Sequence, residues 1–263
     1  MSLDLADNSG FDVILIASTG NEGKFRPETS HHYQAGDPKA SATPFVLIAF
    51  PWFCYDSRMS VDRAKKIKLL LFDVDGVLTD GTIWLFPAPG GMQLHAKDFA
   101  RHHADEGGFG IVSQSTVEAK GFHAHDGAAI SLARLAGIKT GLITKRISET
   151  VALRARDLRL EHVYQGIQDK LTVFEEILAK EGLRADQAAY VGDDVIDLPV
   201  MRSCGMAIAV ANARAEVKAD AHYVTEHRGG EGALRDALEY ILKAQGKWEQ
   251  IVREYIQERS PTK

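Results

Sequence analysis

Two aspartates stand directly behind an apolar segment of the chain. Residues 69–72 are Leu-Leu-Leu-Phe, and Asp73, Asp75 and Gly76 follow within four positions. A continuous apolar run that ends at a glycine turn is typical of a buried strand in a parallel sheet with helices on both faces. Carboxylates this close repel each other unless a divalent cation or a shared proton compensates, and oxygen ligands suit Mg²⁺. Taken alone, such a pair is more often a solvated cap of a turn.

Other predicted strands also end in polar side chains, and these are Thr144, Lys170, Asp193 and Asp194. The carboxyl ends of parallel strands share one edge of the sheet, and ligands bind outside that edge. A phosphate there would meet a carboxylate nucleophile, a hydroxyl donor, an ammonium group and a metal ion, which is the set that phosphoryl transfer requires. Each residue alone has an ordinary structural explanation, but the combination favours a phosphoryl-transfer site.

The elements that would position these side chains alternate between helices and strands from residue 126 onward. Helical spacing and capping residues such as Ser148 and Gly182 predict the helices, and short apolar runs predict the strands. Such alternation indicates βαβ units and an α/β fold around a parallel sheet. The predicted strands are 140–143, 162–164, 188–191, 206–210 and 222–224, and the predicted helices are 130–138, 148–158, 171–180, 197–202, a short one near 215, and one from 233 that runs past Trp248.

Before residue 126, the sequence predicts a β-hairpin and a long insertion. Residues 82–86 alternate as a strand does, residues 87–91 break the pattern, and a return strand is expected around 117–125. The stretch 92–115 is rich in histidine, glycine and charge, which favours a loop. Because no segment between the polar strand ends is both long and regular, we expect a hairpin flap and no separate cap domain.

Composition limits the classes of partner. The chain carries 31 basic and 36 acidic residues, a formal net charge of -5, without a basic stripe that would favour nucleic acid. Cys54 and Cys204 are too few for a disulfide framework or a zinc site, which favours the reducing cytoplasm. The apolar segment 44–55 is shorter than the roughly 20 residues that cross a bilayer. We therefore expect a cytoplasmic protein that binds neither nucleic acid nor membrane.

In order and type, the polar strand ends resemble the four motifs of the haloacid dehalogenase superfamily of aspartate-nucleophile phosphatases. The matching motifs are Asp73-x-Asp75-Gly76, Thr144, Lys170 and Gly192-Asp193-Asp194-x-x-Asp197. Within the superfamily, the chain from about residue 67 to 246, without the insertion, is similar to the 3-deoxy-D-manno-octulosonate 8-phosphate phosphatases. The segments that carry this similarity are 73–81, 164–170, 190–201 and 229–235. The resemblance implies a Rossmann-like parallel sheet in a haloacid dehalogenase-like fold.

The domain boundaries that we expect follow from the extent of this resemblance. Residues 1–60 show no sustained period and form an N-terminal extension, and residues 61–246 form the phosphatase domain, with a loop insertion at about 87–116. Residues 247–263 form a C-terminal helical tail. Met59 precedes a basic lead-in and would make a natural translation start, so the residues before it are either an upstream mis-annotation or a disordered arm.

The resemblance also implies a two-step hydrolysis through an aspartyl-phosphate. Asp73 would attack phosphorus, and Asp75 would protonate the departing sugar alkoxide and then take a proton from the attacking water. Mg²⁺ would be held by Asp73, the backbone carbonyl of Asp75 and Asp193, and it would offset the repulsion between the nucleophile and the phosphate.

Four further residues receive supporting roles from the resemblance. Thr144 would donate a hydrogen bond to a phosphoryl oxygen, and Lys170 would balance the charge of the phosphate and of the Asp73 carboxylate. Asp194 and Asp197 would orient Lys170 or metal-bound waters.

Candidates for contact with the substrate are Thr79, Arg146 and Arg235. The chain departs from the family pattern at two places that bear on them. Lys145 replaces the glycine of Thr-Gly-Arg, and His125 stands where many relatives carry an arginine before Asp-Gly. We still expect Arg146 to meet the substrate phosphate or carboxylate, but a lysine in place of glycine alters the backbone freedom beside it.

Two further features have competing explanations. Residues 229–232 contain three glycines, which either cap the following helix or form a mobile segment that closes over the active site, as the resemblance suggests. They lack the lysine and the serine or threonine of a P-loop. His123 and His125 alternate on the predicted return strand, but no cysteine or third histidine stands at a spacing that would complete a zinc site.

The function implied by the resemblance is hydrolysis of 3-deoxy-D-manno-octulosonate 8-phosphate to the free sugar acid and phosphate, in lipopolysaccharide precursor synthesis. The nearest alternative is a phosphatase for a sialic acid 9-phosphate. An alternative of another class, a non-catalytic tetrameric scaffold, has no need of the complete catalytic set. Because capless relatives form tetramers in which a neighbour's hairpin narrows the site and restricts the entry of water, we expect a homotetramer with the hairpin at its interface.

Overall fold

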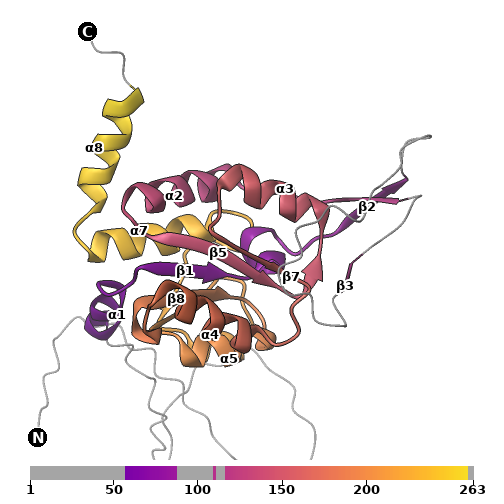
Figure 1. Ribbon diagram of the computed structural model, residues 1–263, viewed down its shortest axis with the longest axis horizontal. Coiled ribbons are helices and arrows are strands. Elements are labelled where there is room, and N and C mark those ends of the chain that lie inside the picture. Colours follow the sequence, from indigo (N-terminus) through magenta and orange to yellow (C-terminus); the bar gives the residue numbers. More distant parts are fainter. Residues whose placement is uncertain (1–56, 88–108, 111–115, 260–263) are drawn as a thin grey trace, which may run out of the picture. The chain divides into compact units, whose positions relative to one another are not determined.

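Figure 1 shows the computed structural model of the chain, in which residues 57–87, 109–110 and 116–259 are described. A six-stranded sheet lies at its centre, with the strand order β10-β9-β8-β1-β5-β7. Every pair of neighbouring strands in this sheet is parallel. The strands are β1 (Leu69–Phe72), β5 (Lys139–Thr144), β7 (His162–Gln165), β8 (Ala188–Gly192), β9 (Met206–Ala209) and β10 (Tyr223–Val224).

Helices connect these strands, as the alternating sequence pattern predicted. The connecting helices are α2 (Ala124–Leu135), α3 (Glu149–Leu158), α4 (Lys170–Glu181), α5 (Leu198–Ser203) and α6 (Ala215–Asp220). Helix α1 (Ser57–Ala64) precedes β1, and α7 (Ala233–Ala244) and α8 (Trp248–Arg259) follow β10. The Ser148 hydroxyl accepts a hydrogen bond from the Val151 N–H and so caps α3, and Gly182 ends α4 in the left-handed region at φ 62°. The predicted α/β fold with a parallel sheet and helices is therefore confirmed.

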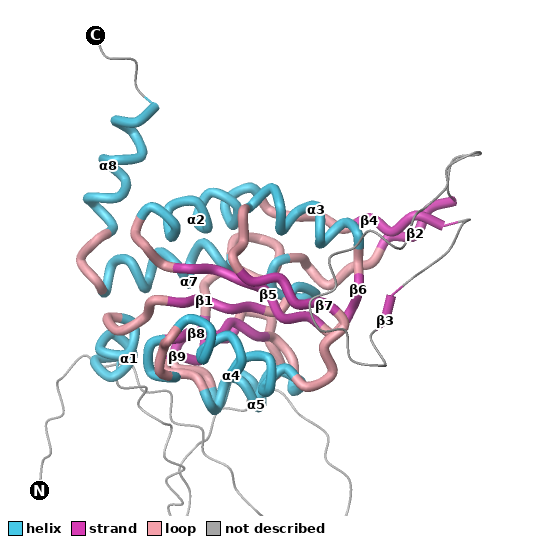
Figure 2. The backbone as a smooth tube through the Cα atoms, in the orientation of Figure 1, coloured by secondary structure: helices cyan, strands magenta, loops and turns pink. Residues whose placement is uncertain are grey.

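The direction of each crossover explains which helices share a face of the sheet. From β1 the chain steps to β5 and then to β7, and it later steps the other way through β8, β9 and β10. Since nearly all such crossovers are right-handed, the two directions place their helices on opposite faces. Figure 2 shows α2 and α3 on one side of the strands and α4 and α5 on the other. Helix α7 packs beside α2.

Strand β1 lies in the middle of the hydrophobic core. All of its residues, Leu69–Phe72, are fully buried, because β5 and β8 flank the strand and helices cover both faces. Full burial on both faces is what the uninterrupted apolar run predicted. The strand therefore delivers Asp73 to the carboxyl edge of the sheet on a rigid support.

A second, antiparallel pair of strands leaves the carboxyl edge of the main sheet. Strand β2 (Trp84–Pro87) pairs with β4 (Thr116–Ala119), with Trp84 opposite Ala119 and Phe86 opposite Val117. A short parallel contact joins β3 (Phe109–Gly110) to β6 (Arg146–Ile147). The rest of the predicted insertion, residues 88–108 and 111–115, lies outside the described residues. So do residues 1–56 of the predicted extension, with Cys54, and residues 260–263.

Two boundary predictions were wrong. The return strand ends at Ala119 and α2 begins at Ala124, so His123 precedes a helix and His125 lies inside it, and the two are not alternate residues of a strand. The last helix does not run unbroken past Trp248. Helix α7 ends at Ala244, and Gly246 at φ 68° turns the chain into α8, because a glycine in the left-handed region stops a helix. In the described part of the chain, no helix has the length and apolarity to span a bilayer.

Candidate active site

The carboxyl edge of the sheet brings the predicted site residues together. Phe72 at the end of β1 is in register with Leu142 of β5 and with Val191 of β8. The strand ends beside it therefore deliver their polar side chains to one place, a hollow of about 290 Å³. The residues that line it are Asp73, Asp75, Thr144, Lys145, Arg146, Asp193, Asp194 and Ile196.

The turn after β1 fits closely around Asp193. Residues Val74–Leu78 form a wide turn that the Thr79 N–H closes by donating to the Val74 carbonyl at 3.0 Å, and Asp75 and Gly76 within it have non-helical backbone angles. The Asp73 carboxylate accepts a hydrogen bond of 2.7 Å from the Val74 N–H. Gly76 has φ 96°, a conformation that side chains rarely allow. A Cβ atom at Gly76 would lie 2.2 Å from Oδ2 of Asp193. The glycine of this motif is therefore required both by its backbone conformation and by the approach of the Asp193 carboxylate.

Lys170 forms ion pairs with two carboxylates, those of the nucleophile candidate Asp73 and of Asp197. Its buried ammonium lies 2.9 Å from Oδ2 of Asp73 and 2.8 Å from Oδ1 of Asp197. Burial alone would lower the pKa of Lys170, but the two carboxylates outweigh it and raise that pKa, so the ammonium stays charged. The Tyr190 hydroxyl also donates to Asp197, at 2.9 Å. This is the arrangement expected of a lysine that balances charge on Asp73.

The acidic residues at this edge fit a cation. Asp73, Asp193 and Asp197 each offer a carboxylate oxygen within 4.8 Å of the others, and among the described residues Oδ1 of Asp193 is buried with no hydrogen-bond partner. Burial raises the pKa of Asp73 to about 6. The positive charge of Lys170 opposes this increase, and the negative charge of Asp197 adds to it. Burial, with Asp73 as the next cause, raises the pKa of Asp193 to about 7. A divalent ion would favour the ionised form of both.

Asp197 is better suited to orientation than to metal binding. Its Oδ1 accepts from Lys170 and Tyr190, and its Oδ2 accepts from the backbone N–H groups of Asp193 and Asp194 at 3.1 and 3.4 Å. These contacts occupy both oxygens and fix the loop that carries Asp193. The assignment of Asp73 and Asp193 as metal ligands, with Asp197 orienting the groups around them, stays a prediction.

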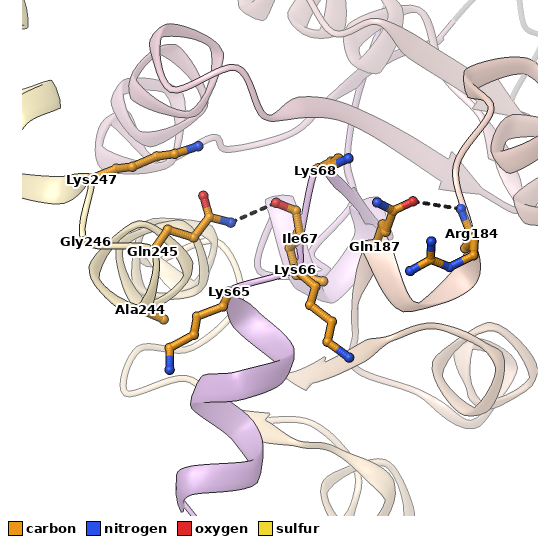
Figure 3. A pocket seen from close by; sticks show the side chains of 10 residues that line it. All are labelled: Lys65, Lys66, Ile67, Lys68, Arg184, Gln187, Ala244, Gln245, Gly246 and Lys247. Carbon is orange, nitrogen blue, oxygen red and sulfur yellow. Dashed lines mark hydrogen bonds between the residues drawn. The ribbon is translucent and has the colours of Figure 1, made fainter.

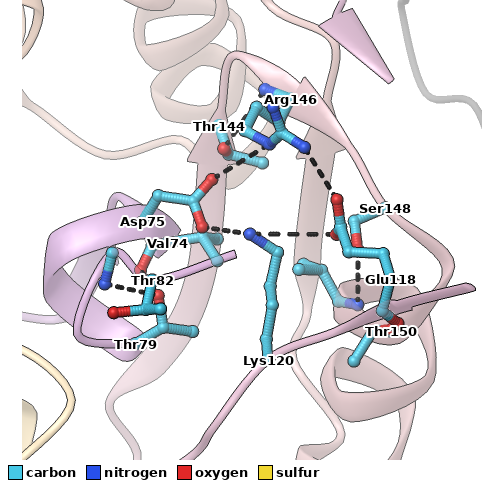
Figure 4. A network of polar contacts seen from close by, with 12 residues as sticks. Val74, Asp75, Thr79, Thr82, Glu118, Lys120, Thr144, Arg146, Ser148 and Thr150 are labelled. Atoms are coloured by element: carbon cyan, nitrogen blue, oxygen red, sulfur yellow. Dashed lines mark hydrogen bonds and ion pairs between the residues drawn. The ribbon is translucent and has the colours of Figure 1, made fainter. Parts of the chain in front are cut away.

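Asp75 lies in a ring of charged side chains that includes two residues not foreseen from the sequence. Figure 4 shows the ammonium of Lys120 between Asp75 and Glu118, with Arg146 across from them. Lys120 donates to Oδ1 of Asp75, and its ammonium lies 3.8 Å from Oε1 of Glu118. Arg146 donates to Oε2 of Glu118 at 2.7 Å, and its Nε lies 3.5 Å from Oδ2 of Asp75. The alternation of Glu118 and Lys120 on the predicted return strand, which puts both side chains on one face, was the available signal.

Thr144 and Asp194 lie at the hollow as expected. Thr144 is buried, with its hydroxyl accepting a long hydrogen bond of 3.4 Å from the Arg146 N–H, and it lines the hollow. The Asp194 carboxylate accepts from the Val195 N–H at 2.7 Å, which starts the short 3₁₀ turn Val195–Asp197. Thr144 is thus placed to donate its hydroxyl proton to a group in the hollow.

Two predicted substrate contacts lie elsewhere in this structure. Thr79 is fully buried, with its hydroxyl donating to the Val74 carbonyl at 3.2 Å and accepting from the Gly81 N–H, so it stabilises the turn instead of facing the hollow. The Arg235 guanidinium donates to Glu239 at 2.9 Å and lies over the Trp248 ring, 4.8 Å from its centroid, outside the residues that line the hollow. Both side chains are held by partners of their own.

The glycine-rich segment before α7 packs on the turn of the nucleophile candidate. The Gly230 N–H donates to the Val77 carbonyl at 2.9 Å, and a Cβ atom at Gly229 would lie 1.7 Å from the Gly76 carbonyl oxygen. Gly232 occupies the N-cap position of α7, with φ 114°. The segment therefore contacts the turn after β1 as well as preceding a helix, and its small residues permit that contact.

A larger hollow of about 640 Å³ lies at the opposite edge of the sheet, next to the start of β1 (Figure 3). Lysine and arginine side chains surround it, but several have local partners. Lys65 pairs with Asp62, Arg184 with Asp186, and Lys247 donates to the Ala136 carbonyl. Among the residues that the structure describes, no carboxylate, hydroxyl or histidine lines it. The residues fitted for chemistry are therefore those at the carboxyl edge.

Known proteins resemble this chain in sequence. A family model described as haloacid dehalogenase-like hydrolase matches residues 142–235. The 3-deoxy-D-manno-octulosonate 8-phosphate phosphatase KdsC of Yersinia pestis is 36% identical over 189 residues, which cover 72% of this chain and 87% of that relative.

Solved structures resemble it as well. The 3-deoxy-D-manno-octulosonate 8-phosphate phosphatase from Moraxella catarrhalis, crystallised with a magnesium ion, a phosphate ion and a KDO molecule, has a TM-score of 0.62 and 33% identity, and the match covers 74% of this chain and 97% of that one. The cobalt-bound deoxy-D-mannose-octulosonate 8-phosphate phosphatase from Haemophilus influenzae has a TM-score of 0.58 and 32% identity, with 73% and 99% covered.

Proposed function

The chain belongs to the haloacid dehalogenase-like hydrolases and is a phosphoric monoester hydrolase, and we propose that its substrate is 3-deoxy-D-manno-octulosonate 8-phosphate. The observation that carries the reaction is the contact of 2.9 Å between Lys170 and Asp73. Asp73 lines the hollow together with Asp193, whose buried Oδ1 has no hydrogen-bond partner among the described residues. The choice of substrate is supported by relatives of that name, which match this chain over most of its length. We place the reaction in the cytoplasm, in the supply of lipopolysaccharide precursors.

In the first proposed step, a carboxylate oxygen of Asp73 forms a bond to phosphorus while the bond from phosphorus to the sugar oxygen breaks. Val74 and Lys170 fix the orientation of that carboxylate through hydrogen bonds to its two oxygens. Asp75 gives a proton to the departing alkoxide, whose protonation is required because an alkoxide is a poor leaving group. The products of this step are the free sugar acid and a phosphorylated Asp73.

In the second step, water attacks the phosphorylated Asp73. Asp75 takes a proton from that water, the new bond from oxygen to phosphorus forms, and the bond from phosphorus to Asp73 breaks, which releases inorganic phosphate and restores both carboxyl groups. Lys170 and Thr144 stay beside the phosphoryl group in both steps and offset its charge. One residue, Asp75, thus serves as acid and then as base.

The metal that we propose is Mg²⁺, held by Asp73, the carbonyl of Asp75 and Asp193. The support is the donor set, since oxygen ligands suit Mg²⁺, and the buried Oδ1 of Asp193 has no partner among the described residues. When bound, the ion supplies positive charge that lets one anion approach another. Removal of divalent ions with EDTA should abolish turnover and Mg²⁺ should restore it.

A rate comparison tests the substrate. The purified protein would be assayed with Mg²⁺ on a panel that includes 3-deoxy-D-manno-octulosonate 8-phosphate, a sialic acid 9-phosphate and simple hexose phosphates. We expect kcat/KM to be highest for the first. A higher value for the sialic acid 9-phosphate would show that Lys145 and His125, where this chain departs from the family pattern, mark a different substrate.

We further propose a homotetramer in which the β2–β4 hairpin contacts a neighbouring subunit. The support is its exposed apolar surface: Trp84, Leu85 and Phe86 have exposed fractions of 57%, 53% and 51%. Large apolar side chains that project together into solvent mark interaction sites. Light scattering behind size-exclusion chromatography should give the mass of four chains, and a Trp84→Glu, Phe86→Glu variant should give a smaller species. A fully active monomer of the unaltered chain would contradict this proposal.

A further inference from the structure

A lysine to which no catalytic role has been assigned contacts the proposed general acid. The Lys120 side chain is completely buried, and its ammonium donates to Oδ1 of Asp75. On its other side the ammonium faces Glu118, which in turn accepts a hydrogen bond of 2.7 Å from Arg146. Lys120 directly follows β4, which ends at Ala119, whereas Asp75 lies in the turn after β1. Figure 4 shows the two side chains pointing toward each other.

The burial of this lysine has no use in packing alone. Removing an ammonium from water is strongly unfavourable unless charged partners compensate, and an apolar residue of the same length fills such a space without that penalty. Lys120 has its partners in Asp75 and Glu118. The burial of a charged side chain at position 120 therefore indicates that its ammonium acts on Asp75.

Lys120 can act on Asp75 by fixing the orientation of its carboxylate. Asp75 stands two residues after Asp73, so its carboxylate could rotate toward the metal ligands. The proposed mechanism requires instead that the Asp75 carbonyl face the metal and that the carboxylate face the leaving group. Lys120 holds Oδ1 of that carboxylate, and Arg146 lies 3.5 Å from Oδ2. Both oxygens are thus held from the β4 and β6 side of the hollow.

We propose that Lys120 is a positioning residue for the general acid and base Asp75, with Glu118 as the anchor that holds Lys120 and Arg146 in place. This inference rests on the proposed function. It also gives the hairpin a catalytic task, because β4 carries Glu118 and ends next to Lys120, so that the packing of the hairpin determines the orientation of Asp75.

Leaving groups of different quality test the proposal. With 4-nitrophenyl phosphate, the departing phenolate needs little protonation, whereas a sugar phosphate needs it in full. Lys120→Met should reduce kcat on the sugar phosphate about 100-fold, the loss typical of a misplaced acid or base. The pre-steady-state burst of 4-nitrophenolate, which reports only the attack by Asp73, should fall less than about threefold. Steady-state turnover of the same ester should still fall, because water activation also requires Asp75.

The controls separate a positioning role from a structural one. Lys65→Met removes an exposed lysine and should change none of these rates. In an Asp75→Asn background, Lys120→Met should have almost no further effect on the sugar phosphate, because the two residues act as a unit. If Lys120→Met does not fold, Glu118→Gln is measured in the same way and should show the same selective loss in weaker form.

Several outcomes would overturn the inference, and they differ from failure of the proposed function. Equal loss of burst and turnover, together with a lowered melting temperature, would show that Lys120 only stabilises the fold. Unchanged turnover of the sugar phosphate in Lys120→Met would show that Asp75 needs no such support. If the unaltered protein hydrolyses neither ester, it is the proposed function that fails.

Discussion

The Asp193 carboxylate packs directly against Gly76, so that a Cβ atom at position 76 would lie 2.2 Å from Oδ2 of Asp193. The turn after β1 and the loop after β8 come from distant parts of the sequence, yet they meet at this contact. The contact places the Asp193 carboxylate beside Asp73, where a cation is expected. The first and the last of the four motifs are therefore mutually dependent positions as well as carriers of reactive groups.

The first prediction concerns Gly76→Ala. The added methyl group must displace Asp193, so kcat should fall at least about 100-fold, because misplacement by about an ångström costs that much. The concentration of Mg²⁺ needed for half-maximal activity should rise as well. Gly137→Ala is the matched control, since Gly137 also has a positive φ, 76°, but an added Cβ would meet nothing within 4 Å. Equal effects of the two substitutions would mean that backbone strain alone is responsible.

A second prediction follows from the raised pKa values of Asp73 and Asp193, about 6 and about 7. In the unfolded chain both carboxyls titrate near pH 4. Between these values the folded protein binds more protons than the unfolded one, so the metal-free protein loses stability as the pH rises from 4 through 7. The melting temperature in EDTA should therefore be lower at pH 8 than at pH 5.

Mg²⁺ should reverse this trend, because it binds the ionised carboxylates of the folded state. Its effect on the melting temperature should be large at pH 8 and small at pH 5. An equal increase at both pH values, or none at pH 8, would contradict the assignment of these two carboxylates to the metal.

Lys170→Met is expected to destabilise the protein as well as to inactivate it. Asp73 and Asp197 would then face each other in the core without a cation, and breaking a buried ion pair typically costs about 3–5 kcal/mol. Denaturant titration at pH 7.5 measures this loss. Adding Asp197→Asn should restore much of the stability without restoring activity, because it removes the repulsion but not the need for the lysine. Lys243→Met, an exposed lysine with a surface ion pair, is the control.

Much of the fold and of the candidate site could be predicted from the sequence, because each strand end carries its own signal. The apolar run before Asp73 and the glycine before Asp193 mark strand ends by local composition. The rules for parallel sheets then place these ends on one edge. Asp73, Thr144, Lys170 and Asp193 could therefore be placed together without knowledge of any contact.

Residues whose placement depends on distant packing could not be predicted. Lys120 contacts Asp75 only because β4 pairs with β2 and brings its end over the catalytic turn. Thr79 and Arg235 were assigned to the substrate by their position in motifs, but the hydroxyl of one satisfies a turn carbonyl and the guanidinium of the other lies on Trp248. Whether such a side chain contacts a neighbouring residue or a ligand depends on distances in the folded structure, which the sequence does not contain.

The central claim is that Asp73 is the nucleophile, and it is tested most directly by trapping the intermediate. The protein would be mixed with Mg²⁺ and substrate, quenched in acid within the first turnover, digested, and analysed by mass spectrometry. We predict a phosphate adduct on Asp73, and an Asp73→Asn variant that folds, with an unchanged far-UV circular dichroism spectrum, but neither forms the adduct nor turns over. An adduct on another residue, or substantial Mg²⁺-dependent turnover by Asp73→Asn, would contradict the account.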